Sequence, residues 1–271
     1  MSFDPFGDFE TTGYLRNSLG LKDPAEVKEN EHFSFEMGLD EALSYLERTK
    51  NLNYQALLQV HRLLFEKFYP WAGRDRLELV PHLSVWKGPK GAPRRTFFES
   101  PAMIERAVDY ALSLASKKQG FMQKPGEVMG LLCFAHPFLD GNGRSILLFY
   151  MELSYRAGFA IDWASTRKDD YLQALDDEIH NPGKGHLDRY LVPFVVPIHS
   201  RDQWPEIIGQ INGLDGMDGE NITYENLDDP EVQKVYAAYH AEHPYPAKDG
   251  TPDSEPAAND ENYSENYADA S

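Results

Sequence analysis

Three side chains in one short segment, Cys133–Tyr150, could do chemistry together. His136 supplies an ionisable imidazole, Asp140 a carboxylate that suits Mg²⁺, and Arg144 a guanidinium that suits phosphate. A glycine-rich triplet, residues 141–143, stands between the last two, and glycines let successive backbone N–H groups form an anion-binding nest. A base, a metal ligand and a phosphate cradle within nine residues are the parts needed for phosphoryl or nucleotidyl transfer.

Two helices are expected to hold this loop. The apolar run Gly126–Ala135 predicts a buried helix, which Pro137 ends because proline cannot continue a helix. A second helix is predicted from Arg144 to Ala157, followed by Gly158 at the position of a left-handed C-terminal cap. Polar side chains buried there without a purpose would be unfavourable, so the loop is a better candidate for a functional site than for a structural turn.

The nine residues from His136 to Arg144 read H-P-F-L-D-G-N-G-R, which resembles the Fic (filamentation induced by cAMP) signature H-P-F-x-[D/E]-G-N-G-R-x-x-R. Two further segments resemble Fic proteins: W-A-G-R-D-R at Trp71–Arg76, which leads into a β-hairpin flap in that family, and Y-L-Q-A-L at Tyr171–Leu175. The chain departs from the signature at Leu147, where the family usually has a second arginine that holds the γ-phosphate of ATP.

The resemblance implies a protein adenylyltransferase, which transfers AMP from ATP to a Ser, Thr or Tyr hydroxyl of a target protein and releases diphosphate. His136 would be the general base, and Asp140 would hold Mg²⁺ against the diphosphate. The flap would hold the target by backbone pairing along its outward strand edge. The nucleotide would be bound by the remaining signature residues: Phe138, Gly141, Asn142, Gly143 and Arg144.

Other activities stay open at this point. Fic relatives also transfer UMP, phosphocholine or phosphate, although glycine at position 141 resembles the AMP-transferring majority. Because Leu147 cannot hold a γ-phosphate, a different donor or a catalytically weak nucleotide-binding module is the main alternative. A zinc hydrolase built on His136 and Asp140 is disfavoured, since no H-E-x-x-H or comparable ligand spacing follows.

Internal inhibition is not expected. Fic proteins often carry an inhibitory helix with the motif [S/T]-x-x-x-E-[G/N], and the nearest match, Ala25–Asn30, has alanine in place of the hydroxyl residue. The second signature arginine that pairs with such a glutamate is also missing. A toxin-like activity would therefore be restrained either by a separate antitoxin-like protein or by a low intrinsic affinity for the nucleotide.

Charge and composition limit the partners. The chain has 271 residues and a net charge of −18, which argues against nucleic-acid binding. From Gly213 onward there are fifteen acidic residues and two lysines, so this part carries −13 and the rest −5. No window of eighteen apolar residues predicts a membrane span, and the single Cys133 favours the cytoplasm. A secretion-related role of the acidic part leaves delivery into another cell open.

The hydrophobic periodicity predicts a mainly α protein with about eight helices and one hairpin, which resembles a Fic-type helical bundle with a flap. We expect an N-terminal surface arm at residues 1–31, a Fic domain at 32–212 and an acidic, mostly disordered tail at 213–271, with at most one transient helix at 230–240. His61 and Trp71 are expected to be core residues. Besides the two helices around the signature, helices are predicted at 33–49, 54–68, 102–117, 168–180 and 186–194, with strands near 77–80 and 96–98.

Overall fold

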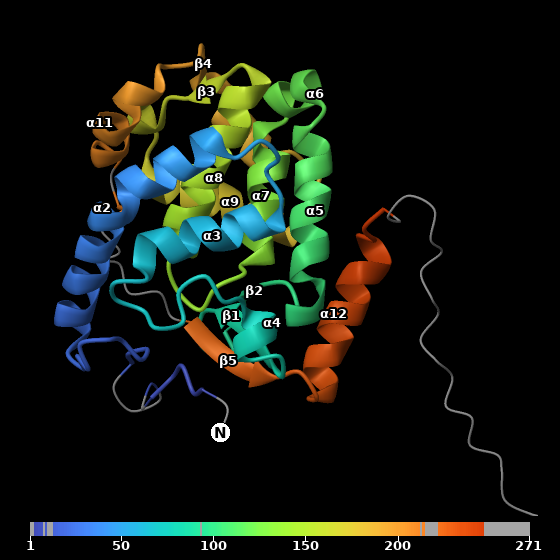
Figure 1. Cartoon of the computed structure of the whole chain (residues 1–271). Coiled ribbons are helices and arrows are strands. Elements are labelled where there is room, and N and C mark those ends of the chain that lie inside the picture. The colour runs from blue at the N-terminus through green and yellow to red at the C-terminus, as the bar shows by residue number, and fades with distance from the viewer. Residues whose placement is uncertain are drawn as a thin grey trace, which may run out of the picture.

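Helices α7 (Pro125–Ala135) and α8 (Asn142–Ala157) run through the middle of the molecule and carry the signature loop between them (Figure 1). The computed structural model describes residues 3–7, 9, 13–92, 94–211, 213–214 and 222–246. Helix α8 begins at Asn142, two residues earlier than expected, because Gly141 makes the left-handed turn before it (φ 74°). The expected mainly α bundle with a small β flap is confirmed.

Helices on both sides cover this central pair. Asp23 and Asn53 cap the first two of them, because their side chains accept the N–H groups of the first turn. Helix α9 (Lys168–His180) has the predicted bounds. Helices α6 (Lys118–Gln123) and α11 (Trp204–Gly209) were not predicted, because six residues are too few to show a hydrophobic periodicity. The surrounding helices are α2 (Pro24–Arg48), α3 (Tyr54–Phe65), α5 (Ile104–Ala115), α6 (Lys118–Gln123), α9 (Lys168–His180), α10 (His186–Leu191) and α11 (Trp204–Gly209).

A three-stranded antiparallel sheet lies at one end of the bundle, in the order β2 (Thr96–Phe97), β1 (Leu83–Lys87), β5 (Ile222–Asn226) (Figure 1). The strand expected at 77–80 is wrong, since residues Arg76–Leu79 form the short helix α4. The cause is Asp75, whose side chain accepts the Glu78 N–H at 2.8 Å and starts a helical turn. A second small sheet pairs β3 (Ala160–Ile161) with β4 (Val195–Val196).

The C-terminal part differs most from expectation. Disorder from residue 213 onward is wrong for β5 and for α12 (Pro230–Glu242), which pack on the flap. Val232 and Tyr236 are buried against Trp86, and Tyr239 lies against Phe97 and Phe134, so aromatic contacts dock this helix. The expected disorder of residues 247–271 falls outside the described part of the chain.

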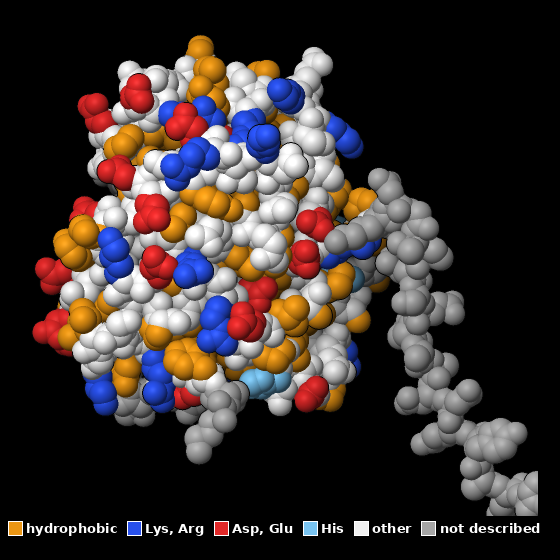
Figure 2. Space-filling view, in the orientation of Figure 1, with side chains coloured by type: hydrophobic (Ala, Val, Ile, Leu, Met, Phe, Trp, Pro, Cys, Tyr) orange, Lys and Arg blue, Asp and Glu red, His pale blue; other side chains and the backbone are white. Residues whose placement is uncertain are grey.

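The N-terminal part is also more ordered than an arm. Helix α2 starts at Pro24 and continues across residue 31, where the boundary of the Fic domain was expected. On the face in Figure 2, acidic and basic side chains lie interspersed among apolar ones. In the described ranges, no helix combines the length and apolar character that crossing a membrane requires.

Candidate active site

The site begins at a strained residue, His136, which ends helix α7 in the left-handed conformation (φ 42°). Among described residues it is the one non-glycine residue with positive φ, a conformation that costs free energy and persists only when neighbours enforce it. The enforcing neighbour is Arg76, which is fully buried. Its Nε donates to the His136 carbonyl at 2.7 Å, and its Nη2 donates to the carbonyls of Glu99 and Ala135. Arg76 therefore fixes the end of α7 from which the imidazole projects.

The His136 imidazole is 8% exposed and lies parallel to the Phe98 ring, with centroids 3.8 Å apart. Burial, and then the positive charges of Arg76 and Lys87, lower the pKa of His136 well below its ordinary value of 6.5. The ring is therefore neutral at neutral pH. A neutral imidazole can accept a proton, as a general base must.

Asn142 ties the loop together and orients this imidazole. Its amide oxygen accepts the Phe138 N–H at 2.9 Å, and its Nδ2 donates to the Phe138 carbonyl at 2.8 Å. With the amide oriented in this way, the other Nδ2 hydrogen points to Nε2 of His136, 3.1 Å away. Nε2 is therefore the acceptor nitrogen, and the ring proton is on Nδ1.

His61 supports the loop from helix α3, as expected of a core histidine. It is fully buried, its Nδ1 accepts the Gly73 N–H at 2.9 Å, and its Nε2 therefore donates to the Asp140 carbonyl at 3.0 Å. The ring lies parallel to Phe138, with centroids 3.8 Å apart. Phe138 is fully buried in this contact, so its side chain is out of reach of a nucleotide and positions the loop instead. Trp71 is a fully buried core residue, as predicted.

The N-terminus of α8 provides the expected anion-binding groups. The first helical bond runs from the Ser145 N–H to the Gly141 carbonyl, so the N–H groups of residues 142–144 have no helical acceptor. These groups and the helix dipole favour a negative charge. Gly141 is required, since a Cβ there would lie 2.5 Å from the Phe65 ring. At Gly143 no heavy atom lies within 4 Å of the equivalent position, which leaves room for a ligand.

The Arg144 guanidinium is held by a residue that the sequence did not reveal. It forms a buried ion pair with Glu31 of helix α2 and lies 4.8 Å from the centre of the Phe65 ring. Nη1 of Arg144 and the hydroxyl of Ser145 are buried without a hydrogen-bond partner. Burial, and then the charge of Asp140, raise the pKa of Glu31 to about 7. A phosphate that binds Arg144 would therefore meet unpaired donors but would compete with Glu31.

Helix α2 also reaches the candidate metal ligand. Nζ of Lys28 lies 3.2 Å from Oδ2 of Asp140, which also accepts a hydrogen bond from the Tyr69 hydroxyl. Burial alone would raise the pKa of Asp140, but the charges of Lys28 and Arg144 outweigh it and hold that pKa below its ordinary value. Among described residues, no group of three or more His, Cys, Asp or Glu side chains could hold a metal ion. Asp140 is therefore a single candidate carboxylate, without a cluster of further acidic or histidine side chains in the described ranges.

Leu147 follows Arg144 by one helical turn, as expected, and is 7% exposed within the principal hydrophobic cluster. The structure therefore brings His136, Asp140, Asn142 and Arg144 together. The sequence did not reveal Lys28 and Glu31. The inhibitory motif has a hydroxyl residue four positions before its glutamate, and Val27 stands at that position relative to Glu31.

Residues 51–153 match the model of the Fic/DOC family. The protein adenylyltransferase VbhT of Bartonella schoenbuchensis is 29% identical over 176 residues, which are 64% of this chain and 35% of that protein. The probable protein adenylyltransferase y4lH of Sinorhizobium fredii is 27% identical over 167 residues, 60% of this chain and 82% of that protein. The matched part thus spans about a third of VbhT and most of y4lH.

Solved structures show the same fold. The BepC effector of Bartonella tribocorum with bound AMPPNP has a TM-score of 0.57 at 23% identity, covering 69% of this chain and 95% of that one. The Fic domain of a Bartonella quintana effector with bound ADP has the same TM-score and identity over 71% of this chain and 95% of that one. Residues 51–153 thus match the Fic/DOC family, and the fold around them is that of solved Fic domains.

Proposed function

We propose that this chain is a protein adenylyltransferase that transfers AMP from ATP to a hydroxyl group of a target protein. The observation that carries the proposal is the contact of Asn142 with Nε2 of His136, because a neutral imidazole beside the free N–H groups of α8 suits the role of general base. The names of VbhT and y4lH, and the AMPPNP and ADP in related structures, support this choice of donor.

In the proposed reaction, the target hydroxyl oxygen attacks the α-phosphorus of ATP while its proton moves to Nε2 of His136. The bond between the α-phosphorus and the bridging oxygen breaks, and diphosphate leaves. The N–H groups of residues 142–144 stabilise the negative charge that develops on the phosphates. To accept the proton, His136 exchanges its contact with Asn142 for one with the hydroxyl.

Asp140 would hold Mg²⁺ together with the phosphates of ATP, because Mg²⁺ is commonly bound by one or two carboxylates plus substrate phosphates. Bound there, the ion neutralises charge on the phosphates. The low pKa of Asp140 fits this role, since the carboxylate is ionised at neutral pH. Lys28 lies on the same carboxylate oxygen, so Mg²⁺ would take its place.

Regulation and location form part of the proposal. Glu31 and Lys28 restrain the site from within the chain, and a separate antitoxin-like protein would be a further restraint. The related structures come from effectors described as VirB-translocated, so the target belongs either to the cytoplasm or to a second cell.

The test is intact-mass analysis after incubation with Mg²⁺ and ATP, UTP or CDP-choline, together with chromatography of the released nucleotide. We expect one adenylyl group on the chain and diphosphate release with ATP. His136→Ala should lower the rate by ~10²–10⁴-fold, the usual effect of losing a positioned general base. The control is His82→Ala, which removes an exposed imidazole outside the loop. Modification by UTP or CDP-choline alone would support the alternative donors, and unchanged turnover of His136→Ala would exclude its role as base.

A further inference from the structure

The outer edge of the flap is already paired in this chain. Strand β1 pairs with β2 through two residue pairs on one side and with β5 through five, from Leu83↔Asn226 to Lys87↔Ile222, on the other. The Val85 carbonyl faces β2, where it accepts the Phe98 N–H at 3.1 Å, so Ser84 and Trp86 turn their backbone groups toward β5. Exposed strand edges bind extended peptides by this kind of pairing. β5 therefore takes the position of such a peptide.

One face of β5 is directed at the catalytic side of the flap. Tyr224 stands opposite Val85, and residues directly opposite in an antiparallel pair share a face. On that face both pack against Phe98, whose ring lies on His136. Burial, and then the charge of Asp140, raise the pKa of Tyr224, which agrees with a phenol on the side of the signature loop. Tyr224 thus lies on the face of the sheet that carries Val85 and Phe98, and its ring is also edge-on to Phe6 and Phe9.

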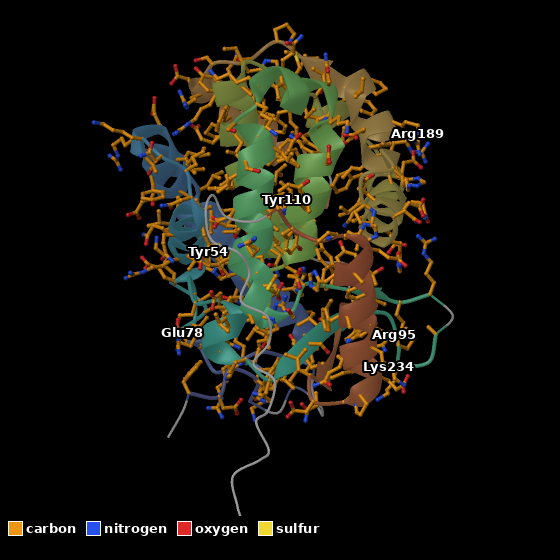
Figure 3. All side chains as sticks on the ribbon, turned by 90° about the vertical axis from the view of Figure 1, so that its right-hand side faces the viewer. Tyr54, Glu78, Arg95, Tyr110, Arg189 and Lys234 are labelled. Atoms are coloured by element: carbon orange, nitrogen blue, oxygen red, sulfur yellow. The ribbon has the colours of Figure 1, made fainter. Side chains whose placement is uncertain are left out.

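Arg95 contacts the side chains on the other face of β5. Its Nη1 donates to Glu225 at 2.5 Å and its Nη2 to the Thr223 hydroxyl at 2.7 Å, while the guanidinium lies 4.6 Å from the centre of a Trp86 ring. Arg95 is 11% exposed and Glu225 12%, so this pair is shielded from water. Figure 3 shows Arg95 at the flap beside helix α12. Next to the strand edge, Arg95 therefore provides a binding site for an acidic residue that directly follows the tyrosine, as Glu225 follows Tyr224.

Most side chains that dock the segment containing β5 stay partly exposed. Of residues 222–246, only Val232 and Tyr236 are buried, and they pack with Trp86 in a small cluster. Tyr236 also donates to the Phe98 carbonyl at 2.7 Å, and Tyr245 donates to a Glu99 carboxylate oxygen at 2.6 Å. The half-buried Tyr239 lies against Phe97 and Phe134, and Tyr224 and Tyr245 pack at the margin of the principal core. Segments with few buried apolar contacts open at lower free energy than the core.

We propose that residues 222–246 are a releasable internal occupant of a peptide-docking edge on β1. The edge recognises an extended segment of a partner protein in which a hydroxyl side chain faces the signature loop and the next residue is acidic and pairs with Arg95. The inference rests on the proposed function for the identity of this partner as the protein that is modified. A target must displace β5 before its own hydroxyl reaches the site.

The test uses the full chain and a fluorescent peptide with the sequence of residues 222–228. Thr223→Pro/Glu225→Pro removes two N–H donors of the internal strand and its contacts with Arg95, which frees the edge. We expect the peptide to bind this variant about tenfold or more tighter than the wild-type chain, and a scrambled peptide to bind neither. Equal binding to both chains, or no binding to a proline variant with an intact circular dichroism spectrum, would overturn the proposal.

Arg95 supplies a matched comparison within the proline variant. Arg95→Ala should weaken peptide binding about tenfold, the range expected for a shielded charge-assisted pair. Arg94→Ala should leave it unchanged, since Arg94 pairs with Asp176 and Asp177 of α9 and not with β5. Equal losses for both variants would refute the role of Arg95.

Hydrogen exchange of the wild-type chain covers the case in which the proline variant does not fold. The amides of Ser84 and Trp86 should exchange about tenfold or more faster than those of Leu132 and Leu148 in the central helices. Equal exchange rates would show that β5 is a permanent strand of the fold. Neither measurement uses catalysis, so a chain that binds the peptide but transfers no AMP contradicts the proposed function and leaves the docking edge standing.

Discussion

The two ring nitrogens of His136 have different tasks. Nε2 faces the Asn142 amide and the N-terminus of α8, whereas the proton stays on Nδ1. Because Asn142 is itself fixed by both backbone groups of Phe138, the imidazole keeps this orientation without a carboxylate partner. The proposed base is therefore oriented by the Asn142 amide and by burial against Phe98, while Arg76 fixes the backbone that carries it.

This environment predicts an unusual pH profile. A histidine base works only when it is neutral, and an ordinary one loses activity as the pH falls through about 6.5. Since burial, Arg76 and Lys87 lower the pKa of His136, kcat/KM should stay level through pH 6.5 and decline only at lower pH. Initial rates of AMP transfer between pH 5 and 8, with nucleotide affinity measured at each pH, test this. A half-maximal rate at or above pH 6.5 would contradict it.

Glu31 and a phosphate compete for one guanidinium, which predicts the effect of Glu31→Gln. A neutral amide holds Arg144 less strongly than a carboxylate, so ATP should bind about tenfold more tightly to the variant in calorimetry. Glu29→Gln is the matched control, because Glu29 is the exposed glutamate two positions earlier on the same helix. Unchanged ATP affinity in Glu31→Gln would show that phosphate does not reach Arg144.

Helix α8 offers one guanidinium to a nucleotide where the family signature has two. Leu147 lies one turn beyond Arg144 in the hydrophobic cluster, so this turn of α8 has no charged side chain that could contact the γ-phosphate of ATP. We expect ATP and ADP to bind the wild-type chain with nearly the same Kd in calorimetry. ATP binding about tenfold tighter, a difference of ~1.4 kcal/mol, would contradict this expectation.

The Leu147→Arg variant tests two properties of this position: its contribution to the stability of the hydrophobic cluster, and the effect of a guanidinium there on phosphate binding. Placing a charge in an apolar cluster should lower the Tm, because an unpaired buried charge costs several kcal/mol. Leu147→Met, which conserves volume and polarity, should keep the Tm within a few degrees of wild type. Thermal unfolding of both variants, recorded beside their ATP affinities, distinguishes lost stability from gained phosphate contact.

The helices were predictable where the periodicity is long and the caps are clear. Helix α9 has the predicted bounds, and Asn53 caps α3 as predicted. The strand expected at 77–80 failed because alternation over four residues is outweighed by one capping carboxylate, Asp75. Strand β5 and the stable docking of α12 could not be predicted from composition, which indicated only a transient helix at 230–240. Contacts with the flap replace the core that this segment lacks.

The candidate site was predictable only within one loop of the chain. The signature placed His136, Asp140 and Arg144 together because they are close in sequence. The residues that orient or pair with them lie far away along the chain, and no local pattern reveals such contacts. These partners are Lys28 and Glu31 of α2, His61 of α3, Tyr69 after it, and Arg76 of α4.

Lys28 and Glu31 stand one turn apart on α2, and each faces the opposite charge of the signature loop. A cation thus lies where Mg²⁺ would bind, and an anion lies where phosphate would bind. The two side chains of α2 therefore carry charges of the same sign, at the same two positions, as a bound metal ion and a bound phosphate. Binding of Mg²⁺ and ATP would then be an ion exchange. The Lys28–Asp140 and Glu31–Arg144 pairs would open, and Asp140 and Arg144 would pair with Mg²⁺ and phosphate instead.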